Sequence, residues 1–430
     1  MAEPAPQLRV DALAEAFAQL GRAGVGVDDV VKDSSKLVEL ASQAPVVRLV
    51  DVVLSEAVAR RASDVHVEAF EQEMTIRYRI DGRCYQVAQP PKSLALAIAS
   101  RLKVLANLDV AESRLPQDGR ILFTSASNRQ IDLRVSTLPT IYGESIVMRV
   151  LDKGSLDKTL AQLGMDDAMQ QTIERLIQRP HGLLLVTGPT GAGKTTTLYA
   201  CLAKLNQPGV KLITTEDPVE YDLPGLVQVA INTKIELSFA VCLRAILRHD
   251  PDVIMVGEIR DRETAQTAIQ AALTGHLVFS TLHTNDAPGA VTRLLDMGLE
   301  QFLVTSTLTG VLAQRLVRSL CPQCRVPYEA SDEDLAALRL QREELTQPLM
   351  KPGGCDACQG IGFKGRSGIF EFLVMTESVR PLIIERASAG ELRAVAAGQG
   401  MRSLREDGIV KVLAGVTTVE EMIRETQDYG

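Results

Sequence analysis

The stretch GLLLVTGPTGAGKTTT, residues 182–197, constrains the fold of this 430-residue chain more than any other. It begins with a short, wholly apolar run at residues 183–186, which is typical of a buried strand in a parallel sheet. A glycine-rich loop follows, and a helical pattern of leucines continues from residue 198 to residue 205. Because a strand, such a loop and a helix in this order are the setting of a phosphate-binding loop, the sequence predicts an α/β nucleotide-binding domain.

The loop also predicts how ATP and Mg²⁺ would be held. Its glycines let backbone N–H groups wrap around phosphates, and the helix N-terminus adds its positive dipole end. Lys194 would reach the β- and γ-phosphates, and the Thr195 hydroxyl would bind Mg²⁺. A glycine-rich turn with a chance lysine is the alternative, which the flanking strand and helix disfavour. The predicted nucleotide-binding residues are Gly188, Pro189, Thr190, Gly191, Ala192, Gly193, Lys194, Thr195 and Thr196.

Two further predicted strands end in carboxylates that suit such a site. Residues 253–256 lead into Gly257-Glu258, and residues 213–215 lead into Glu216-Asp217. Ligands of an open α/β sheet gather at the ends of its strands, so Glu258 is expected to face the γ-phosphate. Each acidic strand end is equally compatible with a solvated loop.

Composition limits the classes of partner. The net charge is −8, aromatic residues make up 4% of the chain and tryptophan is absent. These values argue against a nucleic-acid-binding protein and against base-stacking surfaces. The N-terminal MAEPAPQLRV does not have a secretory pattern, and no apolar run approaches the ~18 residues needed to span a bilayer. We therefore expect a reduced, cytoplasmic protein whose membrane contact comes through partners.

Four of the seven cysteines form two Cys-x2-Cys pairs, Cys321 with Cys324 and Cys355 with Cys358. Two such pairs predict a tetrahedral, all-thiolate Zn²⁺ site that leaves no position open and is therefore structural. Thirty residues separate the pairs, which exceeds the usual ~15–20, and the acidic, helical stretch between them is easily looped out. A redox pair would need a thioredoxin-like setting, which the sequence lacks, and free thiols are the remaining alternative.

The N-terminal half predicts a separate α/β domain. Apolar residues keep helical spacing from residue 49 to residue 57. Residues 74–80 alternate like a half-buried strand, and Asp81-Gly82 then signals a hairpin. Residues 131–136 and 145–150 alternate again. Near the C-terminus, Ser403…Glu406 and Thr418…Glu421 are capping-box patterns that begin helices.

Four ordered stretches, GPTGAGKTTT, TTEDPVEY, LRAILRHDPDVIMVGEIRD and TGHLVFSTLHTNDA, resemble the Walker A, Asp box, Walker B and His box of the secretion ATPase superfamily. The resemblance extends from about residue 44 to the C-terminus. It implies a PAS-like α/β domain (45–155), a RecA-like P-loop ATPase domain (156–318), a tetracysteine zinc-binding segment (319–365) and a helical C-terminal subdomain (366–430). The segment before them (1–44) is expected to be short, partly helical and flexible.

The resemblance also assigns roles within an ATPase site. Glu258 would activate the attacking water, and Glu216 would assist with Mg²⁺ or with the water. His276 and His283 would sense the γ-phosphate, although a histidine in a loop is commonly structural. The stretches ASDVHVE, RLPQDGRI and DLRVSTLPTIYGESIVMRV resemble the family's N-terminal domain, whose arginines reach the nucleotide. This makes Arg120, Arg134 and Arg149 candidates for stabilising charge on the transferring phosphoryl group, with surface ion pairs as the alternative.

Within the superfamily, VLAQRLVRSLCPQC, GFKGRSGIFEFL and LREDGIVKVLAGVTTVEEMIRET resemble the type II secretion ATPases most closely. The resemblance implies a homo-hexameric motor at the inner membrane. Its ATP cycle would act on a platform protein, with an inner-membrane docking protein as a second partner, and drive pseudopilus assembly for type II secretion across the outer membrane. The type IV pilus assembly ATPases are the alternative. A nucleotide-switched scaffold and a DNA-translocating ATPase are alternatives from other classes, and the charge disfavours the second.

Family members usually carry a long N-terminal region that docks on the membrane partner. Here the segment before the matching part is expected to form one short helix, residues 10–22, and a flexible stretch. The resemblance therefore leaves open how this N-terminus docks.

Overall fold

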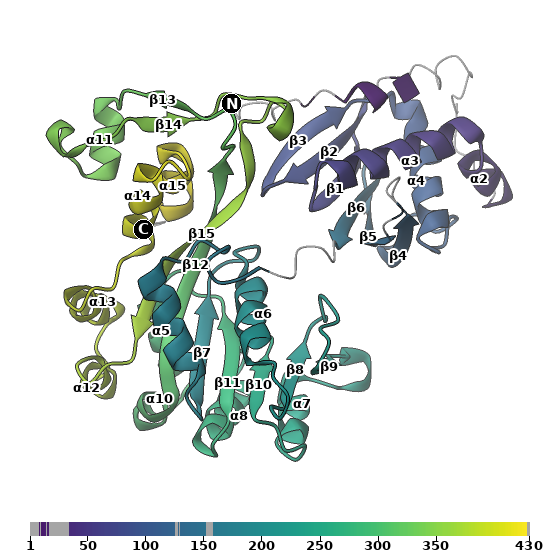
Figure 1. Cartoon of the computed structure of the whole chain (residues 1–430). Coiled ribbons are helices and arrows are strands. Elements are labelled where there is room, and N and C mark those ends of the chain that lie inside the picture. Colours follow the sequence, from purple (N-terminus) through teal and green to yellow (C-terminus); the bar gives the residue numbers. More distant parts are fainter. Residues whose placement is uncertain are drawn as a thin grey trace. The chain divides into compact units, whose positions relative to one another are not determined.

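The computed structural model describes residues 8, 10–13, 15–16, 34–124, 128, 130–151 and 158–427. Most of the helix expected over residues 10–22 lies outside them. The chain divides into two compact units, residues 1–154 and 155–430 (Figure 1). Among the described residues, no helix has both the length and the apolar character that crossing a membrane requires.

The first unit packs helices against an antiparallel sheet. Its described helices are α2 (Ser34–Ala41), α3 (Ala44–Ala59) and α4 (Ala95–Leu105). The buried side chains of α3 recur at helical spacing, which confirms the predicted helix, and α3 and α4 contact β1 and β6 of the sheet. Its strands are β1 (Asp64–Ala69), β2 (Met74–Ile80), β3 (Arg83–Ala88), β4 (Gln117–Thr124), β5 (Gln130–Thr140) and β6 (Gly143–Leu151).

These six strands lie in the order β3-β2-β1-β6-β5-β4, and every neighbouring pair is antiparallel. Strands β2, β5 and β6 confirm the three alternating segments that the sequence predicted. Asp81 and Gly82 both have positive φ, at 48° and 89°, and join β2 to β3. Two successive positive φ angles are the geometry that a two-residue hairpin turn requires, so this prediction is also confirmed.

The second unit is built on a seven-stranded sheet with the order β15-β12-β7-β11-β10-β8-β9. All neighbouring pairs are parallel except β12 with β15. The strands are β7 (Gly182–Thr187), β8 (Leu212–Glu216), β9 (Leu226–Ala230), β10 (Val253–Val256), β11 (Leu277–Leu282), β12 (Leu308–Leu320) and β15 (Phe363–Val374). The three strands predicted in this part of the sequence correspond to β7, β8 and β10.

Helices cover both faces of this sheet (Figure 1). Leu183 and Leu185 of β7 join the core formed with α7, α8 and α9, while Leu184 and Val186 join the core with α5 and α6. A strand buried on both faces has to be apolar throughout, which explains the unbroken run in the sequence. The helices are α5 (Asp167–Ile177), α6 (Lys194–Leu205), α7 (Phe239–Ile246), α8 (Arg262–Leu273), α9 (Ala287–Asp296) and α10 (Gln301–Thr307).

The cysteine pairs belong to an excursion between β12 and β15. It contains β13 (Val326–Tyr328), the expected helix α11 (Asp332–Leu338) and β14 (Leu349–Lys351). Pairing of β13 with β14 brings the two ends of the insertion together. Four helices then end the chain, α12 (Val379–Ile384), α13 (Ala389–Gly398), α14 (Leu404–Leu413) and α15 (Val419–Thr426).

The two predicted caps of these last helices differ in detail. Ser403 and Glu406 form the full capping box of α14, as expected. Thr418 caps α15 by accepting from the Glu421 backbone N–H. The Glu421 carboxylate, however, bonds to Arg318 and Arg424 instead of completing a box.

Candidate functional site

The loop between β7 and α6 lies at the carboxyl end of the parallel sheet. Gly188, Gly191 and Gly193 all have positive φ. A Cβ on Gly188 would lie 2.4 Å from the Gln314 carbonyl oxygen of β12, so only glycine fits at this position. The loop therefore packs directly against the neighbouring strand and leads into the first turn of α6, where Lys194, Thr195 and Thr196 lie.

Lys194 is buried and folds back over the loop. Its Nζ donates to the carbonyl oxygens of Gly188 at 2.7 Å and Pro189 at 3.1 Å, and lies 3.5 Å from His283 Nδ1. Burial lowers the pKa of Lys194 to about 8, the charge of Glu258 opposes this, and the charge of Arg315 adds to it. A desolvated ammonium group at this position is well suited to bind an anion.

Glu258 follows β10 and meets His283, which follows β11. Because β7, β11 and β10 are adjacent parallel strands, their carboxyl ends lie next to one another. His283 Nε2 lies 3.1 Å from Glu258 Oε2, and Arg260 donates to Glu258 Oε1. Burial opposes ionisation of Glu258, but the bonds from Arg260 and His283 outweigh it and lower its pKa. The structure thus joins Lys194, His283 and Glu258 in one group, and the roles expected for them stay predictions.

The other carboxylate candidate, Glu216, does not join this group. It is buried at the end of β8, where the Tyr199 hydroxyl donates to Oε2. Thr214 Oγ1, at 2.5 Å, and Gln228 Nε2, at 3.1 Å, donate to Oε1. Protein donors thus bond to both oxygens of Glu216 and tie it to α6 and β9, and its expected part in binding Mg²⁺ or water stays a prediction.

The structure corrects the expectation that His276 lies beside the γ-phosphate. His276 lies at the amino ends of the parallel strands, whereas the phosphate-binding loop lies at their carboxyl ends. It precedes β11 whereas His283 follows it, and the backbone oxygen of His276 accepts from Gly182 at the start of β7. Its Nδ1 lies 2.9 Å from the Ala271 carbonyl oxygen at the end of α8. Six strand residues, about 20 Å, separate it from the phosphate-binding loop, so it does not lie with the predicted nucleotide-binding residues.

Gln314, which was not among the predicted site residues, braces the loop. It is buried in β12, and its Nε2 donates to the Ala192 carbonyl oxygen at 2.8 Å. Its Oε1 accepts from the Thr197 hydroxyl of α6 at 2.7 Å. The only sequence signal was an amide side chain that directly follows the apolar residues 311–313. Arg260, which bonds to Glu258 and lies 4.0 Å from Asp217, was missed as well.

The three candidate arginines lie in the first unit. Arg120, Arg134 and Arg149 are paired across β4, β5 and β6, so they form one row on one face of the sheet. Arg120 bonds to Asp132, and Arg149 Nε lies 3.1 Å from Asp64 Oδ1. The side chains of Arg120 and Arg149 are nonetheless 67% and 61% exposed. The row therefore combines surface ion pairs with accessible guanidinium groups.

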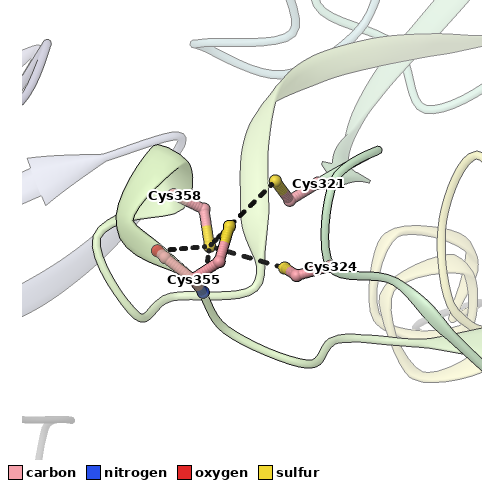
Figure 2. Close-up of side chains that lie close together, drawn as sticks. All are labelled: Cys321, Cys324, Cys355 and Cys358. Atoms are coloured by element: carbon pink, nitrogen blue, oxygen red, sulfur yellow. Dashed lines mark hydrogen bonds between the residues drawn. The ribbon is translucent and has the colours of Figure 1, made fainter.

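The four predicted metal ligands converge (Figure 2). Their sulfur atoms all lie within 4.8 Å of one another. The Sγ–Sγ distances are 3.9 Å for Cys321 and Cys355, 3.7 Å for Cys324 and Cys358, and 3.8 Å for Cys355 and Cys358. Four sulfurs held 2.3 Å from a tetrahedral Zn²⁺ would be about 3.8 Å apart, whereas a disulfide requires about 2.05 Å.

Backbone N–H groups donate hydrogen bonds to two of the four sulfur atoms. Gly354 N donates to Cys324 Sγ, and the N atoms of Cys355 and Gly362 donate to Cys358 Sγ, each at 3.2 Å. Burial raises the pKa of Cys324 to about 11, whereas at Cys358 the two N–H donors and neighbouring thiols outweigh burial and lower the pKa to about 7. The soft, closed donor set fits Zn²⁺ in a structural site.

Comparison with known proteins adds independent findings. The family model for type II/IV secretion system protein matches residues 39–424. The chain is 49% identical over 400 residues to type II secretion system protein E of Pseudomonas aeruginosa, covering 93% of this chain and 79% of that protein. It is 47% identical over 409 residues to the type IV pilus assembly ATPase PilB of Myxococcus xanthus, covering 94% and 72%.

The fold also resembles a solved structure, the pilus retraction motor PilT with bound ADP. The TM-score is 0.57 and the sequence identity is 27%, over 88% of this chain and 97% of that chain. This likeness confirms the expected mixed α/β architecture with a RecA-like nucleotide-binding sheet.

Proposed function

The chain belongs to the type II/IV secretion system protein family, and we propose that it is an ATP-hydrolysing motor that powers type II protein secretion across the outer membrane by driving pseudopilus assembly. One observation carries the enzymatic part of this proposal. The phosphate-binding loop, Glu258 and His283 meet at the carboxyl ends of the parallel strands, with Lys194 and Glu258 on either side of His283. Such a group can bind phosphates and also orient a water molecule.

In this proposal ATP binds the loop at residues 188–196. Backbone N–H groups and the N-terminus of α6 face the phosphates, and Lys194 exchanges its contacts with loop carbonyls for phosphate oxygens. The Thr195 hydroxyl would be the protein ligand of Mg²⁺. The metal, when bound, would offset the negative charge that develops on the β- and γ-phosphates.

Glu258 is the residue proposed to hold and activate the attacking water. Its lowered pKa keeps it ionised, so it can accept a hydrogen bond from water at neutral pH. A neutral His283 with its proton on Nε2 donates to Glu258 and presents Nδ1 to the Lys194 side. A γ-phosphate beside Lys194 would change the contact between Lys194 and His283 Nδ1, and His283 would sense ATP in this way. Glu216 is proposed to act indirectly, by fixing Tyr199 of α6 against β8.

The arginine row of the first unit is proposed to supply further positive charge to the phosphates. Arg120, Arg134 and Arg149 share one sheet face, as arginines that reach a nucleotide together should. The first unit of the same chain or of a neighbouring subunit would carry them to the site. Hydrolysis would then depend on closure and on a homo-hexameric ring.

The tetracysteine cluster is proposed to hold one structural Zn²⁺ through Cys321, Cys324, Cys355 and Cys358. The sulfur spacing and the N–H donors support this ligand set. The metal, when bound, would join the end of β12 to the start of β15.

The proposed location is the cytoplasmic side of the inner membrane. A platform protein and a docking protein of the secretion system would be the partners there. Pilus extension is the second candidate function, because the chain is nearly as similar to a type IV pilus assembly ATPase as to a secretion protein. Restoring either secretion or pilus formation in a strain without its own copy of the gene would separate the two.

The decisive test is phosphate release by purified protein with Mg²⁺ and ATP, with oligomer size recorded on the same samples. Wild type should hydrolyse ATP, and Glu258→Gln should bind it but lose turnover by about 100-fold or more. Glu263→Gln is the matched control, because this exposed carboxylate of α8 bonds to Arg244 at the surface and to no other side chain in the described part of the protein. Equal activity of wild type and Glu258→Gln would refute the role of Glu258. ATP binding without hydrolysis in every assembled form would favour a nucleotide-switched scaffold.

A further inference from the structure

Arg315 of β12 lies beside the phosphate-binding loop and has no role in the site described so far. In the β12–β7 register Ala313 is opposite Thr187, so the next residues of β12 extend past the end of β7 and flank the loop. Gln314 turns toward α6. Because successive strand residues face opposite sides, Arg315 turns toward the loop that follows β11.

One half of its guanidinium group is anchored. Arg315 Nη2 donates to the backbone oxygen of Asn285 at 3.2 Å and to its Oδ1 at 3.3 Å. Asn285 follows His283 by two residues in the same loop. The anchor therefore ties this guanidinium group to the segment that carries the proposed γ-phosphate sensor.

The other half of the guanidinium group is unused. Nη1 is buried and has no hydrogen-bond partner among the residues that the structure describes. It lies 3.4 Å from the point where a Cβ of Gly188 would stand, which places it against the phosphate-binding loop. A buried N–H donor without an acceptor costs free energy, so the position suits an acceptor that arrives with a ligand.

The local charge indicates what that acceptor is. Arg315 forms no ion pair with any carboxylate in the described part of the chain, although Glu425, Asp286 and Glu371 act on it from a distance. The positive charge of Arg315 helps to lower the pKa of Lys194, which lies across the loop. Two cations, Arg315 and Lys194, thus flank Gly188, and an anion between them would satisfy both.

We propose that Arg315 Nη1 donates a hydrogen bond to the terminal phosphate of bound ATP. This inference rests on the proposed function and adds a phosphate contact from the same chain. The terminal phosphate is favoured over the inner ones because Arg315 is anchored to the His283 loop, which lies across from Lys194 and Glu258. With Nη2 held by Asn285, the fork is already oriented, and little rotational freedom is lost when the phosphate binds.

The test is titration calorimetry of purified full-length protein with Mg²⁺ and either ADP or adenylyl imidodiphosphate, a non-hydrolysable ATP analogue. Arg315→Gln should weaken binding of the triphosphate analogue by about tenfold or more, as expected for a lost charge-assisted bond. Binding of ADP should change by less than about threefold on the same scale. Arg315→Lys keeps the charge without the fork and should fall between wild type and Arg315→Gln.

Two further variants separate binding from structure. Arg293→Gln removes an exposed positive charge of α9 and should leave both affinities unchanged. Asn285→Ala keeps Arg315 but removes the side-chain part of its anchor, so it should weaken the triphosphate analogue more than ADP, though by less than Arg315→Gln. Melting curves of all variants without nucleotide would show whether the fold is retained.

Unchanged triphosphate affinity in a folded Arg315→Gln protein would overturn the inference and leave the proposed function standing. Equal losses for ADP and the triphosphate analogue would also overturn it, because the contact would then not be to the terminal phosphate. A wild-type protein that binds neither nucleotide would overturn the proposed function, and this inference with it.

Discussion

Replacing Gln314 by alanine should destabilise the second unit and weaken nucleotide binding together. The Gln314 amide bonds to the Ala192 carbonyl oxygen of the loop and to the Thr197 hydroxyl of α6, at 2.8 Å and 2.7 Å. Gln314 is 1% exposed and Thr197 is 0% exposed, so water does not replace either contact. The substitution therefore leaves one loop carbonyl and one hydroxyl without their partner.

The expected magnitude follows from what each group can do next. The Thr197 hydroxyl can turn to the Gly193 carbonyl oxygen one helical turn earlier, because the Thr197 backbone N–H already bonds there at 3.1 Å. The Ala192 carbonyl has no such substitute, and a small cavity remains beside it. An unpaired buried carbonyl and the lost packing together cost about 3 kcal/mol. In a unit of residues 155–430, this is a fall of roughly 5 °C in melting temperature.

Calorimetric melting and ADP titration on the same samples would measure both effects. Gln314→Ala should also raise the dissociation constant for ADP by about tenfold, because the loop loses its brace. Thr197→Val is the matched control, since it removes one of the two bonds but leaves the one to the loop. It should lower the melting temperature by about 2 °C and change ADP affinity little.

The reasoning would be refuted by a Gln314→Ala protein that melts about 5 °C lower but binds ADP as tightly as wild type. In that case Gln314 would stabilise the sheet without holding the loop. An equal loss of affinity in Thr197→Val would also refute it, because the effect would then come from α6 rather than from the Ala192 carbonyl.

Three further predictions concern protonation, the metal and a buried ion pair. Lys194 has a pKa of about 8 in the empty site, and bound phosphates favour its charged form. Nucleotide binding should therefore take up a proton above pH 8 and weaken as pH rises, which calorimetry at pH 9 in buffers of different ionisation enthalpy would detect; equal heats in all buffers would contradict it. The purified protein should contain one zinc by elemental analysis, which Cys358→Ser loses and Cys84→Ser, in the first unit, retains; zinc-free wild type would contradict the ligand set. Glu421→Gln leaves Arg318, itself 5% exposed, beside a neutral partner and should cost about 3 kcal/mol, or roughly 5 °C of melting temperature, whereas Glu425→Gln on the same helix should cost little; equal melting of both variants would contradict this.

Much of the fold could be predicted from the sequence because local patterns and long-range packing agree. Residues 183–186 are apolar because both faces of β7 are covered, so the same run that predicts a strand also predicts its place at the centre of a sheet. Asp81-Gly82 specifies its hairpin turn locally. The cysteine pairs likewise identify their partners by residue type, since four thiols at this spacing have few other uses.

The site was harder to predict where its residues depend on the register between distant strands. His276 and His283 belong to one motif, yet the six residues of β11 place them at opposite edges of the sheet. Knowing that a strand lies between them would have been sufficient to separate them. Glu216 also ends a strand at the correct edge, but its neighbours Tyr199 and Gln228 are remote in sequence, and no local pattern indicates that they occupy its oxygens.

Gln314 and Arg315 also could not be assigned to the site from local sequence patterns. They are consecutive residues of β12, more than a hundred positions after the loop, and the register with β7 alone brings them to Gly188. The alternation of a strand then divides them, so that the amide holds the loop from the α6 side while the guanidinium group faces the His283 loop. A phosphate-binding loop can be predicted from its own residues, because backbone N–H groups do most of the binding. Gln314 and Arg315, by contrast, come from β12, and only the order of the strands in the sheet places β12 beside the loop.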